Sequence, residues 1–168
     1  MLRALSLSSL AVAALAATSG VGSLSAQNNA SATVSATVQQ PITVTKNSDL
    51  SFGNVFPGID KSIAVTTGGA AKFTVAGQAS TPINLTFTIP ATIASSGNNL
   101  TLASWTGHHA TTDVTSGGTT FTPSASATSA TLSGSGALYV YVGATAQPTS
   151  TQAAGSYSGS MTMTVVYF

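Results

Sequence analysis

The chain has 168 residues, of which 43% are apolar and only 4% charged, and it contains neither cysteine nor glutamate. That length allows one domain of ordinary size. Four basic residues cannot neutralise a run of phosphates or hold an anionic membrane surface, so nucleic-acid and membrane-surface partners are not expected. With only three carboxylates, dispersed along the chain, we expect no enzyme, no catalytic residue and no cofactor.

Residues 1–26 have the layout of a secretory signal peptide. Arg3 supplies a positive start, residues 4–17 form an apolar stretch, and two glycines break it before Ala26, where we place the cleavage to within one residue. The stretch is shorter than the roughly 18 residues that span a bilayer, and no later segment is long and apolar enough, so the mature chain has no predicted transmembrane segment. The sequence predicts secretion through the periplasm to the cell surface or an extracellular fibre.

The expected mature chain is formally neutral. Its three lysines balance its three aspartates when the histidines are neutral: Lys46, Lys61 and Lys72 against Asp49, Asp60 and Asp113. Proteins near zero net charge repel one another weakly and tend to associate.

Period-two alternation of apolar and polar residues recurs along the mature chain and predicts strands, because successive strand side chains face opposite sides of a sheet. We expect an N-terminal extension at 27–40 and a β-sandwich domain at 41–168. Beyond Ile42 and Val44, the candidate strands are 50–55, 61–66, 72–77, 82–89, 99–103, 119–122, 137–143 and 156–168. Residues 107–136 read as a long loop or decorated hairpin. We also expect a positive φ at Gly77 and Gly143, which end apolar runs. The fold class is all-β, an immunoglobulin-like β-sandwich of about seven to nine strands.

The last strand has two distinct faces. Serine and threonine occupy one face, and the other carries Tyr157, Gly159, Met161, Met163, Val165 and Tyr167. With its penultimate aromatic residue, it resembles the C-terminal strand of chaperone-usher pilins, which pairs with a periplasmic chaperone and with other subunits. The alternative is an ordinary sandwich strand, since these also alternate.

The N-terminal extension carries a second alternating segment ahead of Pro41. Its apolar positions are Ala30, Ala32, Val34, Ala36 and Val38. It resembles the donor strand by which one pilin completes the fold of the next, an exchange in which main-chain hydrogen bonds bind and alternate side chains enter pockets. Two alternatives remain open: the first strand of the protein's own sheet, or a frayed tail.

A wider resemblance covers residues 41–168. It is carried by five blocks, at 41–44, 50–55, 73–77, 138–143 and 155–159. They are similar to a family of secreted bacterial β-sandwich proteins of unknown function, itself similar to spore coat protein U and to chaperone-usher pilins. The resemblance implies an exported structural subunit whose partners are neighbouring copies or related subunits, a periplasmic chaperone and an outer-membrane usher. The chain departs from many of those relatives in having no disulfide.

The remaining candidates for a site lie between Trp105 and Gly118. A metal at His108, His109 and Asp113 is not predicted, because adjacent strand residues point to opposite faces and a usual site needs three or four convergent ligands. Trp105 with the two histidines suggests the alternative function, a cell-surface adhesin or carbohydrate-binding module, since aromatic rings offer flat apolar faces. The competing interpretation of Trp105 is a half-buried core residue.

Overall fold

The computed structural model describes residues 28–168, so the predicted signal peptide and its cleavage site lie outside the described residues. The described residues fall into two units, one that ends at residue 36 and one that covers residues 37–168. In the first unit, residues 28–36 are exposed and form no strand. Within residues 28–168, no helix is long and apolar enough to cross a membrane.

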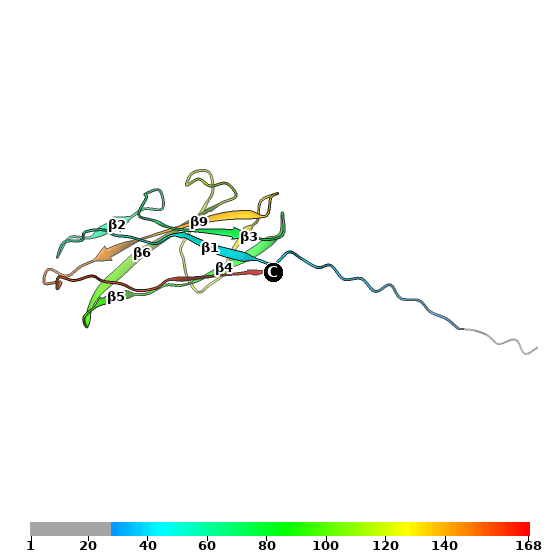
Figure 1. The fold of residues 1–168 in the computed structure, drawn as a ribbon, viewed down its shortest axis with the longest axis horizontal. Coiled ribbons are helices and arrows are strands. Elements are labelled where there is room, and N and C mark those ends of the chain that lie inside the picture. Colours follow the sequence, from blue (N-terminus) through cyan, green and yellow to red (C-terminus); the bar gives the residue numbers. More distant parts are fainter. Residues whose placement is uncertain (1–27) are drawn as a thin grey trace, which may run out of the picture. The chain divides into compact units, whose positions relative to one another are not determined.

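The second unit contains ten strands in two sheets (Figure 1). They are β1 (Thr43–Ser48), β2 (Lys61–Ile63), β3 (Ala71–Ala76), β4 (Pro82–Thr88), β5 (Thr92–Ser95), β6 (Asn98–Ala110), β7 (Thr119–Phe121), β8 (Thr128–Thr131), β9 (Ala137–Gln147) and β10 (Thr162–Tyr167). The larger sheet follows the order β1-β3-β9-β6-β5, with β2 continuing beside β9 and β7 beside β6. The smaller sheet has the order β10-β4-β8. The predicted all-β sandwich is confirmed.

The alternating sequence produces the core between the sheets. Along β3 and β9, Val75 pairs with Leu138 and Phe73 with Val140, and all four side chains are buried. The interposed Thr74 and Tyr139 point to the other face of the larger sheet and are partly exposed. Ile83, Leu85 and Phe87 of β4 supply the opposing layer. This burial of apolar area is the main stabilising contribution available to a chain without disulfides.

Two predicted strands differ from the observed ones. Residues 50–55 form no strand; the amide of Ser51 donates to the carbonyl of Gly69, and Gly53 takes a positive φ of 61°. In the predicted strand 156–168, regular pairing begins only at Thr162, and before it a single bridge joins Ser158 to Ala94. The stretch predicted as a loop, 107–136, holds the end of β6 and the short strands β7 and β8.

The expectation about two glycines was wrong. Neither Gly77 nor Gly143 has a positive φ. They are needed because other groups approach their Cα atoms: a Cβ on Gly77 would lie 2.5 Å from the Tyr167 hydroxyl, and one on Gly143 would meet the carbonyl oxygen of Ile63. Close approach across strands, a tertiary property, selects glycine at both positions.

Gly107 in β6 allows a test of this packing. A Cβ at that position would collide with the ring of Phe121, which also stacks against Phe87 of the smaller sheet at 5.5 Å between centroids. Gly107→Ala is therefore expected to lower the free energy of unfolding by about 1–3 kcal/mol, the usual cost of overpacking. Gly134→Ala is the matched control, since a Cβ there meets nothing within 4 Å. Urea denaturation measures both, and equal stability of the two variants would contradict the packing argument.

Candidate functional site

The two sheets leave one side of the sandwich open. β1 is an edge strand of the larger sheet and β10 an edge strand of the smaller one. They lie on the same side of the domain, because the hydroxyl of Tyr167 in β10 donates to the carbonyl of Gln40, just ahead of β1, at 2.7 Å. Val44 of β1 shares a register pair with the fully buried Val75, yet it is 41% exposed. The core-facing side of β1 therefore lacks cover from the smaller sheet.

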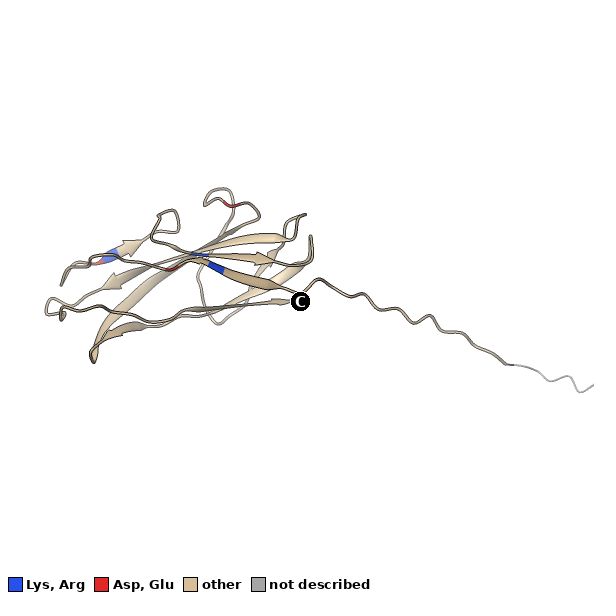
Figure 2. Ribbon diagram, in the orientation of Figure 1, with Lys and Arg blue, Asp and Glu red and all other residues tan. Residues whose placement is uncertain are grey.

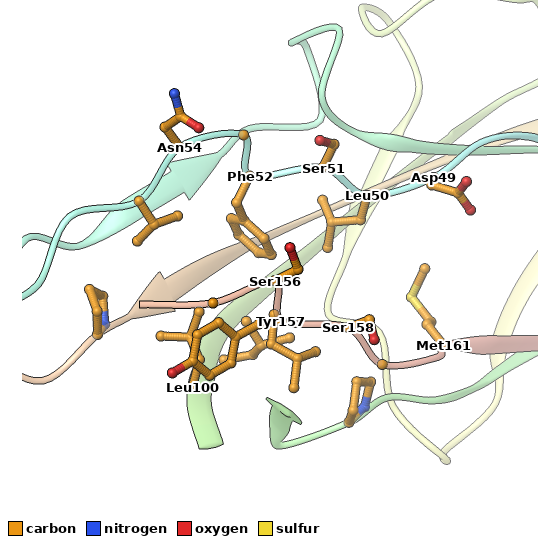
Figure 3. A pocket seen from close by; sticks show the side chains of 18 of the residues that line it. Asp49, Leu50, Ser51, Phe52, Asn54, Leu100, Ser156, Tyr157, Ser158 and Met161 are labelled. Carbon is orange, nitrogen blue, oxygen red and sulfur yellow. The ribbon is translucent and has the colours of Figure 1, made fainter. Parts of the chain in front are cut away.

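Along this open side lies a groove of about 970 Å³. One wall is formed by residues 46 and 48–57, which begin in β1 and lead toward β2. The other wall is formed by residues 152–161, which lead into β10. Figure 3 shows Phe52 and Leu50 reaching down from the first wall toward Tyr157 on the second. Beyond the end of β1 at Ser48, both walls lack regular strand pairing, so most of the groove lies between two irregular segments.

The floor of the groove is apolar. It includes Leu100 and Leu102, which together with Ala146 form a second core cluster of buried residues. Four partly buried side chains pack against that cluster and also line the groove: Phe52, Ile93, Trp105 and Tyr157. An extended segment with apolar side chains on one face would bury them against this floor.

The second wall is fixed in position on its far side. Ser158 and Ala94 exchange two backbone hydrogen bonds of 3.1 Å, which join the wall to β5. The Tyr157 hydroxyl donates to the carbonyl of Ala153 at 2.8 Å and accepts from the side chain of Gln152 at 2.7 Å. Since alternate residues of an extended strand direct their backbone groups to opposite sides, the groups of Tyr157 and Gly159 point away from β5. The wall thus presents a backbone edge for further pairing.

Charge is nearly absent from the groove. Among its lining residues only Lys46 and Asp49 are charged, and they pair with each other at 2.5 Å with both side chains mostly exposed. Figure 2 shows how few charged residues the domain carries, and β4, β8 and β10 of the smaller sheet have none. A solvent-exposed pair of this kind contributes little to stability.

The residues predicted at the C-terminal strand lie along the groove and the core. Tyr157, Gly159 and Met161 line the groove. The other three continue along β10: Met163 is buried, and Val165 and Tyr167 pack against the main core. The N-terminal set, Ala30, Ala32, Val34, Ala36 and Val38, is fully exposed and forms no strand, with Val34 at 95% and Val38 at 94%.

Sequence reasoning missed most of the groove lining. Leu50 and Phe52 were assigned to a strand, and Leu100 and Leu102 were read as ordinary strand residues with no link to a site. The available signal was the run of Ser, Gly, Asn and Pro that interrupts the apolar pattern between 51 and 58, which argues against a regular strand there.

The alternative site between Trp105 and Gly118 is divided by the fold. Trp105 is half-buried and packs against both core clusters. His109 lies 5.8 Å from Phe121 between ring centroids, whereas His108 lies 6.2 Å from Tyr141, and both histidines are buried. The three rings therefore form no shared exposed surface. Residues 28–168 contain no group of three metal-ligating side chains.

Asp113 takes part in an ion pair on the outer face of the larger sheet. Its carboxylate accepts from Lys72 Nζ at 2.7 Å and from the Tyr141 hydroxyl. The hydrogen bond from Lys72, followed by that from Tyr141, lowers the pKa of Asp113. Burial and the Asp113 carboxylate raise the pKa of Tyr141 to about 12. The cluster ties the loop after β6 to the sheet.

The model of one protein family, described as Domain of unknown function (DUF4402), matches residues 42–167. The chain belongs to this family. A search of curated proteins found no match. The DUF4402 range begins one residue before β1 and ends with β10, so it coincides with the sandwich and its groove and leaves out the N-terminal extension.

The buried His109 gives the DUF4402 domain a predicted pH dependence. Burial, and secondarily the neighbouring His108, lower the pKa of His109 below 6.5. The unfolded chain therefore binds a proton at His109 more readily than the folded one, so stability is retained above about pH 6.5 and falls as the pH drops below it. The midpoint of thermal unfolding is expected to be lower at pH 5 than at pH 7.5.

The control for this prediction is His109→Gln, which removes the titrating group and keeps a polar side chain. Its unfolding midpoint should change less between the two pH values than that of the unaltered protein. Asp113 does not interfere, because its pKa is lowered from 3.8 and it stays ionised across this window. An identical pH response in the variant would exclude His109 as the cause.

Proposed function

We propose that this protein is an exported structural subunit of an extracellular fibre or surface coat, and that copies join by inserting a strand into the groove of a neighbour. The donor is residues 30–38, and the acceptor is the groove between residues 46–57 and 152–161. In such β-augmentation, main-chain hydrogen bonds give affinity and alternate side chains fill pockets.

The observation that carries the proposal is the exposure of Val34 and Val38 in a chain whose sandwich has an open apolar groove. A β-branched side chain over 90% exposed contributes nothing to its own fold. Burying each valine in a partner would contribute about 1.5–3 kcal/mol. The extension thus has apolar side chains without cover, and the groove has an apolar floor without an occupant.

The dimensions of the two parts agree. Val34 and Val38 are four residues apart, which is about 13 Å in an extended strand. Tyr157 and Met161, both on the second groove wall, have the same four-residue separation. Two anchors spaced in this way would reach two sites on the groove floor while the strand pairs with the wall between them.

Export and assembly partners follow from the same proposal. Residues 1–26 would be removed on secretion, which leaves a formally neutral chain suited to association. A vacant apolar groove is an aggregation hazard, because an unpaired edge is a template for other chains. We therefore propose that a periplasmic chaperone covers the groove until an outer-membrane usher, or direct exchange, replaces it with the next subunit's strand.

The donor strand is tested by placing charge on its apolar face. Val34→Asp with Val38→Asp should abolish high-molecular-weight assemblies, because two carboxylates would have to be buried on the groove floor at a prohibitive cost. The sandwich itself should keep its thermal unfolding midpoint, since these residues are exposed and outside its strands. Size-exclusion chromatography with light scattering, without denaturant, measures the assemblies.

The matched control adds the same charge to the other face of the strand. Ser35→Asp with Thr37→Asp places two carboxylates on side chains that alternate with the valines and would remain in water, so assemblies should persist. The donor-strand proposal fails if the two double variants assemble equally, whether both form polymers or neither does.

A further inference from the structure

One end of the sandwich carries two large apolar side chains held by a tight turn. Phe56 is 64% exposed and Ile59 63% exposed, and the amide of Ile59 donates to the carbonyl of Phe56 at 3.1 Å. Between them, Pro57 and a Gly58 with φ of 72° fit the two central positions of a type II turn. The Gly58 amide also donates to the carbonyl of Thr149 at 3.0 Å. The turn is fixed, and its apolar side chains have no cover in this copy.

The opposite end of the sandwich carries a second exposed apolar group. Val166 and Phe168 are both at least half exposed, with Phe168 at 68%. In Figure 1 the C-terminus lies at one end of the strands and the segment that leads into β2 at the other. The groove is lined by Phe56 and Pro57, so it opens at the turn end.

A short tether fixes where the extension leaves its own sandwich. The Tyr167 hydroxyl donates to the carbonyl of Gln40 and accepts from the amide of Gln78, both at 2.7 Å. Gln40 is therefore held at the C-terminal end of the domain. Val38 is two residues earlier, so it can be no more than about 7 Å farther away along the chain.

The tether limits how two copies can be arranged. If Val38 of one copy lies in the groove of another, the donor's C-terminal end must lie within a few ångströms of that site. In one arrangement, Val38 of the donor copy lies where the acceptor's groove opens, beside Phe56 and Pro57. The donor's sandwich then lies beyond the turn end of the acceptor, and the inserted strand runs antiparallel to residues 156–161 of the acceptor. With reversed polarity, Val38 would sit near Met161 and the donor body would have to overlap the acceptor's flank.

We propose that the turn at residues 56–59 is a second contact between copies, packing end to end against Val166 and Phe168 of the copy that donates its strand. This inference rests on the proposed function and adds the surface that joins the two bodies. A head-to-tail contact between different surfaces does not end at a dimer; it propagates into a filament unless the rotation between copies closes a ring. It would also make successive subunits rigid with respect to one another.

The charge distribution suits such a contact. Residues 114–168 contain no charged side chain, so no side-chain charge lies near Phe168 in the sequence. Beside the turn, Asp60 and Lys61 cancel each other in formal charge, and the Asp60 carboxylate accepts from the side chain of Gln147 at 3.2 Å. The side chains beside the turn therefore bring no net charge to the place where the two ends would meet.

Crosslinking tests the contact directly, because the chain has no native cysteine. Two populations of the full mature chain, one with Ile59→Cys and one with Phe168→Cys, are mixed during assembly and treated with a short thiol-specific bismaleimide. We expect a covalent dimer. The matched control replaces Ile59→Cys with Thr120→Cys, at an exposed site on β7 away from both ends, and should give none.

A second pair of mixed populations, one with Val34→Cys and one with Phe52→Cys, reports strand insertion separately from the end-to-end contact. Crosslinks at both pairs support the inference. A 34–52 crosslink without a 59–168 crosslink overturns the end-to-end contact while the proposed function stands. Absence of the 34–52 crosslink overturns both, whatever the other pair shows.

Lipid is the alternative occupant of the turn, and the same variants distinguish it. The proposal would be overturned in favour of a membrane-inserting turn by three results together. The unaltered protein would sediment with phosphatidylcholine vesicles, the variant with Phe56→Ser and Ile59→Ser would not, and no 59–168 crosslink would form. If the turn joins copies instead, Ile59→Ser alone, at a residue outside the groove lining, should keep the 34–52 crosslink and form markedly shorter assemblies. No vesicle binding is then expected of the unaltered protein or of either variant.

Discussion

The unequal width of the two sheets leaves one side of this domain without cover. The larger sheet is five strands across, whereas the smaller has three, and β1 and β10 end them on the same side. A three-stranded layer cannot cover the core-facing side of β1, so Val44 stays exposed beside the buried Val75. The groove, its apolar floor and its backbone edge all follow from this missing cover. An isolated sandwich would gain stability from one more strand in that position.

The scarcity of charged side chains affects how the edge strands beside the groove are protected from pairing with other chains. Edge strands are commonly guarded by lysine, proline or inward-pointing charge against pairing with other chains. Here the groove has one such guard, the exposed Lys46–Asp49 pair, and its other wall has none. Of the charged side chains in residues 28–168, Lys46 and Asp49 lie at the groove and Asp60 and Lys61 beside the turn, whereas the second groove wall and β10 carry none. That uncharged edge suits the strand pairing proposed above.

In the proposed assembly, the extension and the turn would act at opposite ends of one subunit. Tyr167 ties Gln40 to the C-terminal end through two hydrogen bonds, so the donor strand has little freedom where it leaves the domain. A short tether lowers the entropy lost on insertion and raises the effective concentration of the second contact. Strand insertion and end-to-end packing would therefore reinforce each other, each making the other less costly.

Strands at the centres of the sheets could be predicted from the sequence. Segments with no partner strand, or with a single bridge to one, were wrongly predicted as regular strands. β3, β4 and β9 combine apolar alternation with β-branched and aromatic residues, and they occupy the centres of the sheets. Residues 50–55 and 156–161 have similar local patterns, but the first lacks a partner strand and the second pairs only through Ser158. Pairing depends on which strand lies alongside, which local sequence does not specify.

The sequence by itself determined the all-β class, the alternating faces of the terminal segments and the scarcity of charge, because these depend on side-chain period and composition alone. Only the tertiary structure decided that Tyr157 and Met161 face Phe52 across a groove, that His108 and His109 are buried apart, and that Gly77 and Gly143 are required by close approach. These features bring together residues up to about a hundred positions apart. They are set by strand order and register, which arise from packing of the whole chain.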